Sequence, residues 1–133
     1  MISARKDERG FILAMDFKNL PFIPVMAFTV SDVPVLTTRG KHAHRNTSQC
    51  LICVHGSVDV SLIYFEKDLE RTKSVRMHPG QTITISPMVW NKQVYHKDTV
   101  VLVYCDRPYD ESDCIRDYDQ FVELNLNRNN PSQ

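Results

Sequence analysis

Short apolar or alternating segments separated by turn signals dominate this chain from residue 9 to residue 106, and they constrain its fold more than any other feature. Strand-like segments occur at residues 11–15, 25–30, 49–54, 58–64, 74–77, 82–86 and 99–104. This density of strands, with no helical pattern between them, predicts an all-β fold, either an antiparallel barrel or a jelly roll. Residues 55–57 and 78–80 have turn composition and are predicted to close hairpins between the strands on either side.

One short helix is predicted near the end of the chain, at residues 113–124. Ile115, Tyr118 and Val122 would lie on one stripe of this helix. Asp110 or Ser112 can cap its start, because their side chains accept hydrogen bonds from free backbone N–H groups.

Length and charge limit the number of domains and the classes of partner that the chain can have. Its 133 residues suit one domain, which we expect at residues 1–126, with a polar tail at residues 127–133. The 16 basic and 16 acidic residues form no long block, so we expect no nucleic-acid and no membrane partner. The N-terminus lacks the apolar core of a signal peptide, and the longest apolar run, residues 20–30, is interrupted by two prolines. We therefore expect a cytoplasmic protein.

The segment His42-Ala43-His44, followed by Gln49 and Gly56, carries the strongest chemical signal. Two histidines at i and i+2 of a strand point to one face, roughly 6.5 to 7 Å apart, so both can enter a barrel interior. The spacing resembles the first motif of a cupin barrel, in which His-x-His is followed by a glutamate and then a glycine. Gln49 stands in place of that glutamate. The resemblance implies a cupin fold, the double-stranded β-helix form of the jelly roll.

The set of candidate metal ligands is incomplete. A cupin metal site usually adds a third histidine from a later strand, and the corresponding residues 86–92 contain none. Cys50 and Cys53 would point to opposite faces of a strand, so they cannot easily share a zinc ion. Two imidazoles without a carboxylate are a poor set for iron, manganese or zinc. We therefore interpret the histidine pair first as an organic acid-base device, without metal or cofactor, and second as a metal site.

A series of motifs, in order along nearly the whole chain, resembles the nucleotide-sugar 3,4-ketoisomerases, small cupins that act on dTDP-4-keto-6-deoxyglucose. The matching residues are Asp7-x-Arg9-Gly10, Arg39-Gly40-x-His42-Ala43-His44, Gln49, Gly56-Ser57, Pro87-x-Val89-Trp90 and Tyr109-Asp110-Glu111-Ser112-Asp113-x-Ile115-Arg116-Asp117-Tyr118-x-x-Phe121.

The resemblance implies a reaction and its partners. The carbonyl of a dTDP-linked keto sugar moves from C4 to C3, and a pyridoxal-phosphate aminotransferase then makes a 3-amino-3,6-dideoxy sugar. No redox cofactor or metal is implied. Relatives often carry His or Arg where this chain has Asn91, and tyrosines where it has Phe28 and Thr29. Because these changes touch the sugar pocket, the configuration of the product at C4 stays open.

Resemblance and geometry together assign His44 as the principal acid-base residue, with His42 as its partner, although the order can be reversed. An imidazole suits proton transfer because its ordinary pKa lies near 6.5. His42 would shuttle a proton between sugar oxygens or polarise the carbonyl. Gln49 can orient an imidazole or hydrogen-bond a sugar oxygen without attracting a metal. A hydrogen-bonded histidine pair in the core is the structural alternative.

Four further residues are predicted to contact the substrate. Arg39 and Arg9 are candidates for the pyrophosphate or a developing oxyanion, since a guanidinium fork suits both, and loop charges are the alternative. Trp90 can stack on thymine or lie beneath the sugar, and a core position is the alternative. Asn91 is expected in the sugar pocket.

Three other functions remain open from the sequence. A 3,5-epimerase acting on the same substrate would also begin by removing the C3 proton. A metal-dependent dioxygenase would need ligands that the chain does not show, and a non-catalytic sugar-binding cupin fits the changed pocket residues. The resemblance and the many short strands also suggest a homodimer, which would cover exposed sheet edges.

Overall fold

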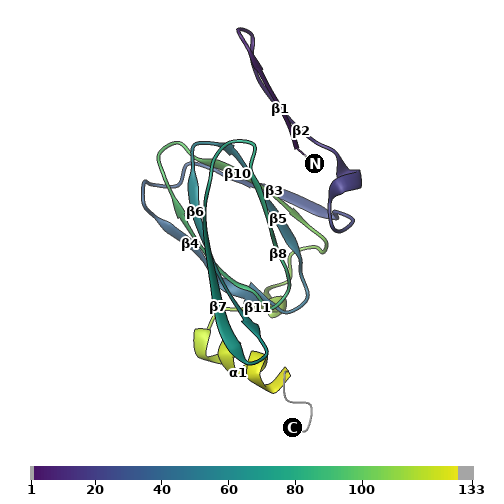
Figure 1. Cartoon of the computed structure of the whole chain (residues 1–133), viewed down its shortest axis with the longest axis vertical. Helices are drawn as coiled ribbons and strands as arrows, with labels where there is room; N and C mark the ends of the chain where they lie inside the picture. The colour runs from purple at the N-terminus through teal and green to yellow at the C-terminus, as the bar shows by residue number, and fades with distance from the viewer. Residues whose placement is uncertain (1, 129–133) are drawn as a thin grey trace.

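Two antiparallel sheets face each other and enclose the interior of the protein (Figure 1). The computed structural model describes residues 2–128. One sheet has the order β3-β10-β5-β8 and the other β11-β4-β9-β6-β7, while β1 and β2 form a separate hairpin. The strands are β1 (Ile2–Asp7), β2 (Gly10–Met15), β3 (Met26–Val30), β4 (Thr38–His44), β5 (Gln49–His55), β6 (Val58–Glu66), β7 (Leu69–Met77), β8 (Thr82–Ile85), β9 (Trp90–Tyr95), β10 (Val100–Cys105) and β11 (Cys114–Ile115).

The core lies between the sheets, and on β6 and β10 it is built from alternate residues. On β6, Val58, Val60 and Leu62 are buried in it, as the alternation in the sequence predicts. Leu51 of β5 and Val101 of β10 meet them from the other sheet. The predicted all-β cupin jelly roll is thus confirmed.

Both predicted hairpin turns are wrong. Residues 55–57 connect β5 of one sheet to β6 of the other, and residues 78–80 likewise connect β7 to β8. In a jelly roll, the chain crosses from one sheet to the other at such turns. The amino-acid composition of a turn does not distinguish a connection between sheets from a hairpin within one sheet. The hairpin between β6 and β7 turns at Lys67 and Asp68, which both have positive φ, as in a type I′ turn.

Sequence analysis gives no strand bounds for β1, β4, β9 and β11, and β4 and β9 have polar residues on their inner faces. β4 and β9 carry arginine, histidine, asparagine and glutamine there, so neither shows the apolar alternation of a core strand. β7 begins at Leu69, before the predicted residue 74, because its first half is exposed on both faces. β1 is likewise largely exposed.

The C-terminal helix α1 (Tyr118–Arg128) begins five residues after its predicted start. Asp110 caps the 3-10 helix η2 (Glu111–Asp113), and Ile115 belongs to β11, where it pairs with Ala43. The helix also includes Asn127 and Arg128, which the sequence assigns to the tail; the rest of that tail, residues 129–133, lies outside the described residues.

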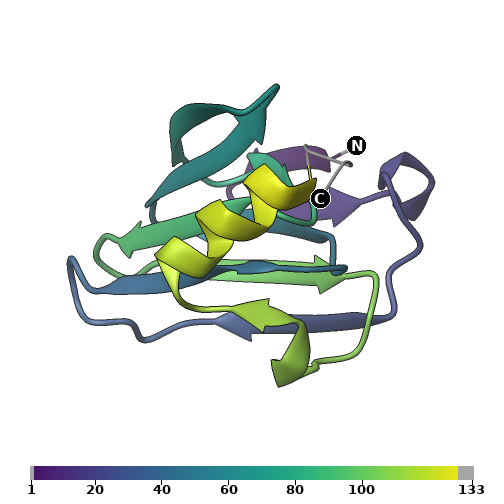
Figure 2. The same ribbon diagram turned by 90° about the horizontal axis from the view of Figure 1, so that it is seen from below.

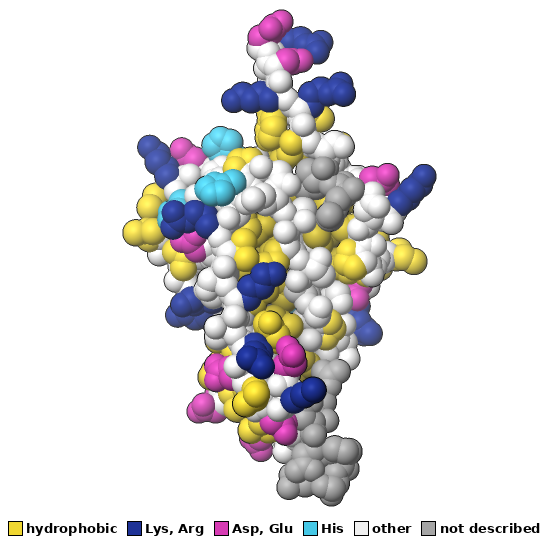
Figure 3. Space-filling view, in the orientation of Figure 1, with side chains coloured by type: hydrophobic (Ala, Val, Ile, Leu, Met, Phe, Trp, Pro, Cys, Tyr) yellow, Lys and Arg dark blue, Asp and Glu magenta, His cyan; other side chains and the backbone are white. Residues whose placement is uncertain are grey.

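The helix and the N-terminal hairpin occupy opposite ends of the molecule (Figure 1). Figure 2 shows the helix running across the end of the sheets, where Phe121 is fully buried. A short 3-10 helix, η1 (Phe17–Asn19), links the hairpin to β3. None of the helices within residues 2–128 is long and apolar enough to cross a membrane. Acidic and basic side chains are interspersed on the face shown in Figure 3.

Candidate active site

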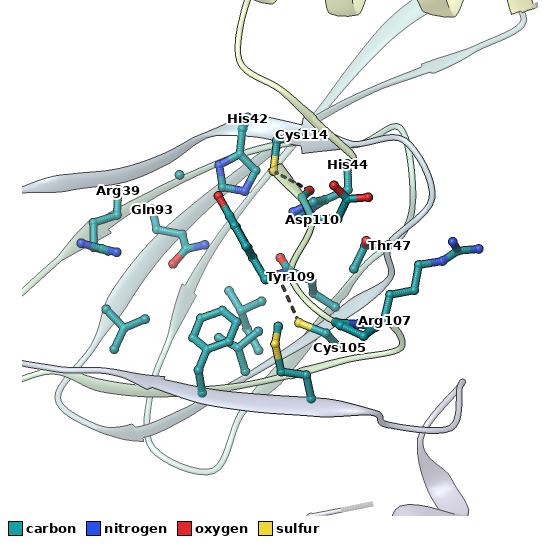
Figure 4. Close-up of a pocket in the computed structure, with 18 of the residues that line it drawn as sticks. Arg39, His42, His44, Thr47, Gln93, Cys105, Arg107, Tyr109, Asp110 and Cys114 are labelled. Carbon is teal, nitrogen blue, oxygen red and sulfur yellow. Dashed lines mark hydrogen bonds between the residues drawn. The ribbon is translucent and has the colours of Figure 1, made fainter. Parts of the chain in front are cut away.

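A cavity of about 220 Å³ opens between the two sheets (Figure 4). One wall is apolar and comes from β3, β5 and β10, through Met26, Phe28, Val30, Leu51 and Val103. The opposite wall is polar and comes from β4 and β9. The segment between β10 and α1 covers part of the mouth. A cavity with one apolar and one polar wall suits a sugar ring, which has apolar faces and hydrogen-bonding edges.

A β-bulge brings Arg39 to the same cavity as His42 and His44. Residues i and i+3 of a regular strand point to opposite faces, but the pairing of β4 with β9 shifts between Gly40 and His42. Gly40 has φ +86° and Lys41 φ +58°, so one residue is accommodated without pairing. A Cβ at Gly40 would lie 2.8 Å from Asn91 Oδ1, which explains why this position needs glycine.

The two histidines lie against each other. Their ring centroids are 4.9 Å apart and the ring planes meet at 79°. Burial lowers the pKa of both imidazoles, and the neighbouring His42 lowers that of His44 further. Nδ1 of His42 is buried and has no hydrogen-bond partner within the described part of the chain. The site therefore holds two neutral imidazoles, one of which has a buried nitrogen without a hydrogen-bond partner.

Asn91 lies behind the histidines and is completely buried. Its amide donates to the backbone carbonyl of His42 at 3.2 Å, and its own oxygen accepts from Gln93 at 3.0 Å. Gln93 in turn accepts from the Tyr95 hydroxyl at 2.8 Å. Asn91 is not among the residues that line the cavity. The structure therefore places this predicted substrate contact in a chain of hydrogen bonds that holds the bulge.

Gln49 lines the cavity at the start of β5 and is buried. Its amide donates to Cys105 Sγ at 3.4 Å, which leaves its oxygen without a partner in that contact. The cupin glutamate position is thus occupied by an uncharged group that faces the same cavity as the histidines. Within residues 2–128, no group of three or more His, Cys, Asp or Glu side chains could hold a metal ion.

Two predicted site residues lie outside the cavity. Arg9 is at the tip of the β1–β2 hairpin, where it pairs with Asp7 at 2.8 Å and remains exposed. Trp90 is buried beneath α1, with its ring 5.2 Å from Tyr118 and 5.6 Å from Phe121. The hairpin projects away from the sheets, and the indole belongs to an apolar cluster, so neither side chain lines this cavity (Figure 1).

The segment after β10 contributes residues that sequence analysis did not assign to the site. Arg107, Tyr109, Asp110, Cys114 and Arg116 all line the cavity. Their motif is visible in the sequence, but sequence analysis gives it no role beyond the family match and the capping of a helix. Nothing in the local pattern indicates that this segment returns to the mouth of the barrel.

Asp113 attaches this segment to the turn between β4 and β5. Its carboxylate accepts hydrogen bonds from the backbone and side chain of both Asn46 and Thr47. Burial raises the pKa of Asp113, but these hydrogen bonds more than offset that effect and leave it below the ordinary value. A charged, buried carboxylate with four donors fixes the segment in place over the histidines.

Comparison with known proteins agrees with this geometry. Residues 1–125 match the family model described as "FdtA: WxcM-like, C-terminal". The chain is 32% identical over 129 residues to TDP-4-oxo-6-deoxy-alpha-D-glucose-3,4-oxoisomerase of Aneurinibacillus thermoaerophilus, covering 92% of this chain and 90% of that enzyme.

Solved structures give the same result. The sugar 3,4-ketoisomerase QdtA of Thermoanaerobacterium thermosaccharolyticum, solved with TDP, superposes with a TM-score of 0.83 at 28% identity, covering 96% of this chain and 92% of that chain. A variant of QdtA has also been solved with TDP-4-keto-6-deoxyglucose. A dTDP-4-dehydrorhamnose 3,5-epimerase of Bacillus anthracis, at 15% identity and a TM-score of 0.71, covering 85% of this chain and 73% of that chain, shares the fold. By the family match and the identity to the oxoisomerase, this chain belongs to the FdtA family of WxcM-like C-terminal domains.

Proposed function

We propose that this protein is a TDP-sugar 3,4-ketoisomerase that moves the carbonyl of a TDP-4-keto-6-deoxyhexose from C4 to C3. The observation that carries the proposal is the pair of neutral imidazoles, 4.9 Å apart, in a cavity with one apolar and one polar wall. The named relatives, which act on TDP-linked sugars, support the choice of substrate.

The chemistry needs three proton transfers, and the pair can supply all of them. His44 removes the proton from C3, which gives an enediolate across C3 and C4. His42 moves the remaining oxygen-bound proton from O3 to O4, and His44 returns its proton to C4. No atom is gained or lost, so the reaction needs no redox partner. Gln49 hydrogen-bonds a sugar oxygen beside the imidazoles.

The diphosphate needs cationic partners, and of the two arginines predicted for it, Arg39 and Arg9, only Arg39 lines the cavity. Arg39 and Arg107 both line the cavity, and neither forms an ion pair within residues 2–128. Pockets that enclose drug-sized ligands measure roughly 300 to 1,000 Å³. The cavity, at about 220 Å³, therefore holds the hexose and leaves the nucleotide at the rim, within reach of these guanidinium groups.

A homodimer is part of the proposal. The β1–β2 hairpin stands apart from both sheets, and a lone two-stranded hairpin is marginally stable in water (Figure 1). The segment before the edge strand β3 exposes Ile23 and Val25. Pairing of two chains would cover these side chains and support the hairpin. The reaction product, a 3-keto sugar, is the substrate type for a pyridoxal-phosphate aminotransferase, which we propose as the next enzyme.

The test is to incubate the protein with TDP-4-keto-6-deoxyglucose in deuterated buffer and to follow C3, C4 and C5 by NMR. Carbonyl migration with deuterium exchange is the expected result. Inversion at C5 would indicate a 3,5-epimerase instead, and absence of exchange would favour a sugar-binding cupin.

We also expect that activity needs no metal, because His42 and His44 have no carboxylate in the glutamate position. Turnover should be unchanged after incubation with a chelator and gel filtration. About one iron, manganese or zinc per chain, with activity lost to the chelator and restored by that metal, would contradict this.

A further inference from the structure

The segment after β10 places an aromatic hydroxyl at the mouth of the cavity. Tyr109 lines the cavity and also lines a second, more open cavity of about 370 Å³ beside it. In Figure 4 its ring extends across the mouth, with the hydroxyl on the side of His42. The side chain is 66% exposed, so nothing covers it until a ligand binds.

Two charged residues fix the orientation of this hydroxyl. Tyr109 donates its only hydroxyl proton to Glu111. Glu111 is held by Arg116 through two further hydrogen bonds, of 2.6 and 2.9 Å. Because the proton of Tyr109 is engaged, its oxygen presents lone pairs to the cavity and acts there as an acceptor. Such a group matches a hydroxyl of a sugar and does not match a carbonyl, which can only accept.

We propose that Tyr109 contacts the hexose directly by accepting a hydrogen bond from a ring hydroxyl, and that Glu111 and Arg116 position it. This inference rests on the proposed function, since it needs a sugar in the cavity. It assigns a binding residue to the segment that covers part of the mouth.

The same ion pair also acts on His42 through its charges. The negative charge of Glu111 raises the pKa of His42 and the positive charge of Arg116 lowers it, although burial has the larger effect and lowers it. The ionisable groups that line the cavity around His42 come from β4, β10 and the segment after it: Arg39, His44, Cys105, Arg107, Tyr109, Asp110, Cys114 and Arg116.

The first test uses Tyr109→Phe, which removes one exposed oxygen. Titration calorimetry should show unchanged affinity for TDP, which has no hexose, and roughly 5- to 10-fold weaker binding of TDP-glucose, as expected for one lost hydrogen bond. KM for the keto sugar should rise by a similar factor. Tyr104→Phe is the matched control, because that ring packs against Phe17 outside the cavity and should leave both affinities unchanged.

The second test concerns the positioning pair. Glu111→Gln leaves the charge of Arg116 unbalanced and should lower the pKa of His42, read from its ring signals by NMR, whereas Arg116→Gln should raise it. A purely structural role would not shift the two variants in opposite directions. Equal TDP-glucose affinity in Tyr109→Phe and the wild type, or an unchanged pKa of His42 in both charge variants, would overturn the inference. A wild type that binds TDP but does not move the carbonyl would instead contradict the proposed function.

Discussion

Two groups of side chains in this protein contain histidine, and they differ in whether their polar atoms have hydrogen-bond or ion-pair partners. On the outer face, Asp59 of β6 accepts from Arg76 at 2.7 Å and contacts His96 Nε2 at 2.8 Å. Arg76, and to a lesser extent His96, lower the pKa of Asp59 to about 2. In the cavity, the rings of His42 and His44 pack against each other, and Nδ1 of His42 has no hydrogen-bond partner within residues 2–128.

The difference separates a structural group from a reactive one. A paired charge at the surface is stabilised in one protonation state, and such a pair contributes little to stability. A buried nitrogen without a partner costs free energy in the folded protein, and that cost is recovered when a ligand supplies the missing hydrogen bond. We therefore expect substitutions of His42 and His44 to lower activity, and substitutions in the outer group to change only stability.

The largest expected effect is on turnover of His44→Asn. If His44 transfers the proton at C3, turnover should fall by roughly 10² to 10⁴, the usual contribution of a positioned acid-base residue. Fold and TDP affinity should persist, as measured by circular dichroism and calorimetry. His42→Asn should also be damaging, and Gln49→Ala should cost less if it only orients its neighbours.

His96→Asn is the matched control from the outer group and should keep wild-type turnover. Retention of full turnover and of deuterium exchange at C3 by His44→Asn would refute the catalytic role. The histidine pair would then be a structural feature of the core.

The next effect concerns Asn91, which supports His42 from behind. Asn91→Ala removes the donor to the His42 carbonyl and should lower the free energy of unfolding by about 1 to 3 kcal/mol, the cost of leaving a buried polar group unpaired. Turnover should fall roughly 10-fold, because a displaced bulge misplaces the imidazole. Chemical denaturation and steady-state kinetics measure the two effects.

Asn125→Ala tests whether the loss of turnover is specific. Asn125 is also a buried asparagine that donates to a backbone carbonyl, that of Phe121, but it lies on α1 away from the cavity. It should lose stability and keep turnover. If both variants lose turnover equally, Asn91 has no special role in positioning His42.

A comparison of β6 with β4 and β9 shows what the sequence can predict. Alternating apolar residues identified β6 and the core, since burial of one face leaves a direct pattern. On β4 and β9 the inner face is polar because it builds the site. These strands therefore lack the alternation of apolar and polar residues by which a strand is recognised in the sequence. The spacing of His42 and His44 was nevertheless sufficient to place both in one cavity.

The rest of the cavity depends on contacts that are distant in the sequence. Tyr109 and Arg116 reach the mouth because Asp113 binds Asn46 and Thr47, more than 60 residues earlier. No local pattern encodes that contact. Trp90 is the opposite case, a residue predicted for the site that lies in the core. An aromatic residue beside a motif can belong to either, and here it packs under α1.

A smaller effect is expected from pH. Burial lowers the pKa of His42 and His44 below 6.5 in the folded protein. As the pH falls below 6.5, the unfolded chain therefore binds protons more readily than the folded one, and stability should decrease. Turnover should fall as the pH drops below the lowered pKa, by about tenfold per pH unit, because a protonated imidazole cannot accept the C3 proton. A fall in kcat/KM that begins well above pH 6.5 would contradict neutral, buried imidazoles.

The smallest effect is expected at the outer group. Asp59→Asn breaks the ion pair with Arg76, and exposed pairs of this kind contribute little to stability. Because the pKa of Asp59 is lowered to about 2, its contribution is complete above the ordinary value of 3.8 and is lost as the pH falls towards 2. The urea midpoint of Asp59→Asn should therefore lie slightly below that of the wild type at pH 7, with the gap closing near pH 2, while turnover at pH 7 stays unchanged. A loss of turnover comparable to that of His44→Asn would mean that the two histidine groups are linked through the sheet, and the contrast between a satisfied outer group and an unsatisfied cavity pair would fail.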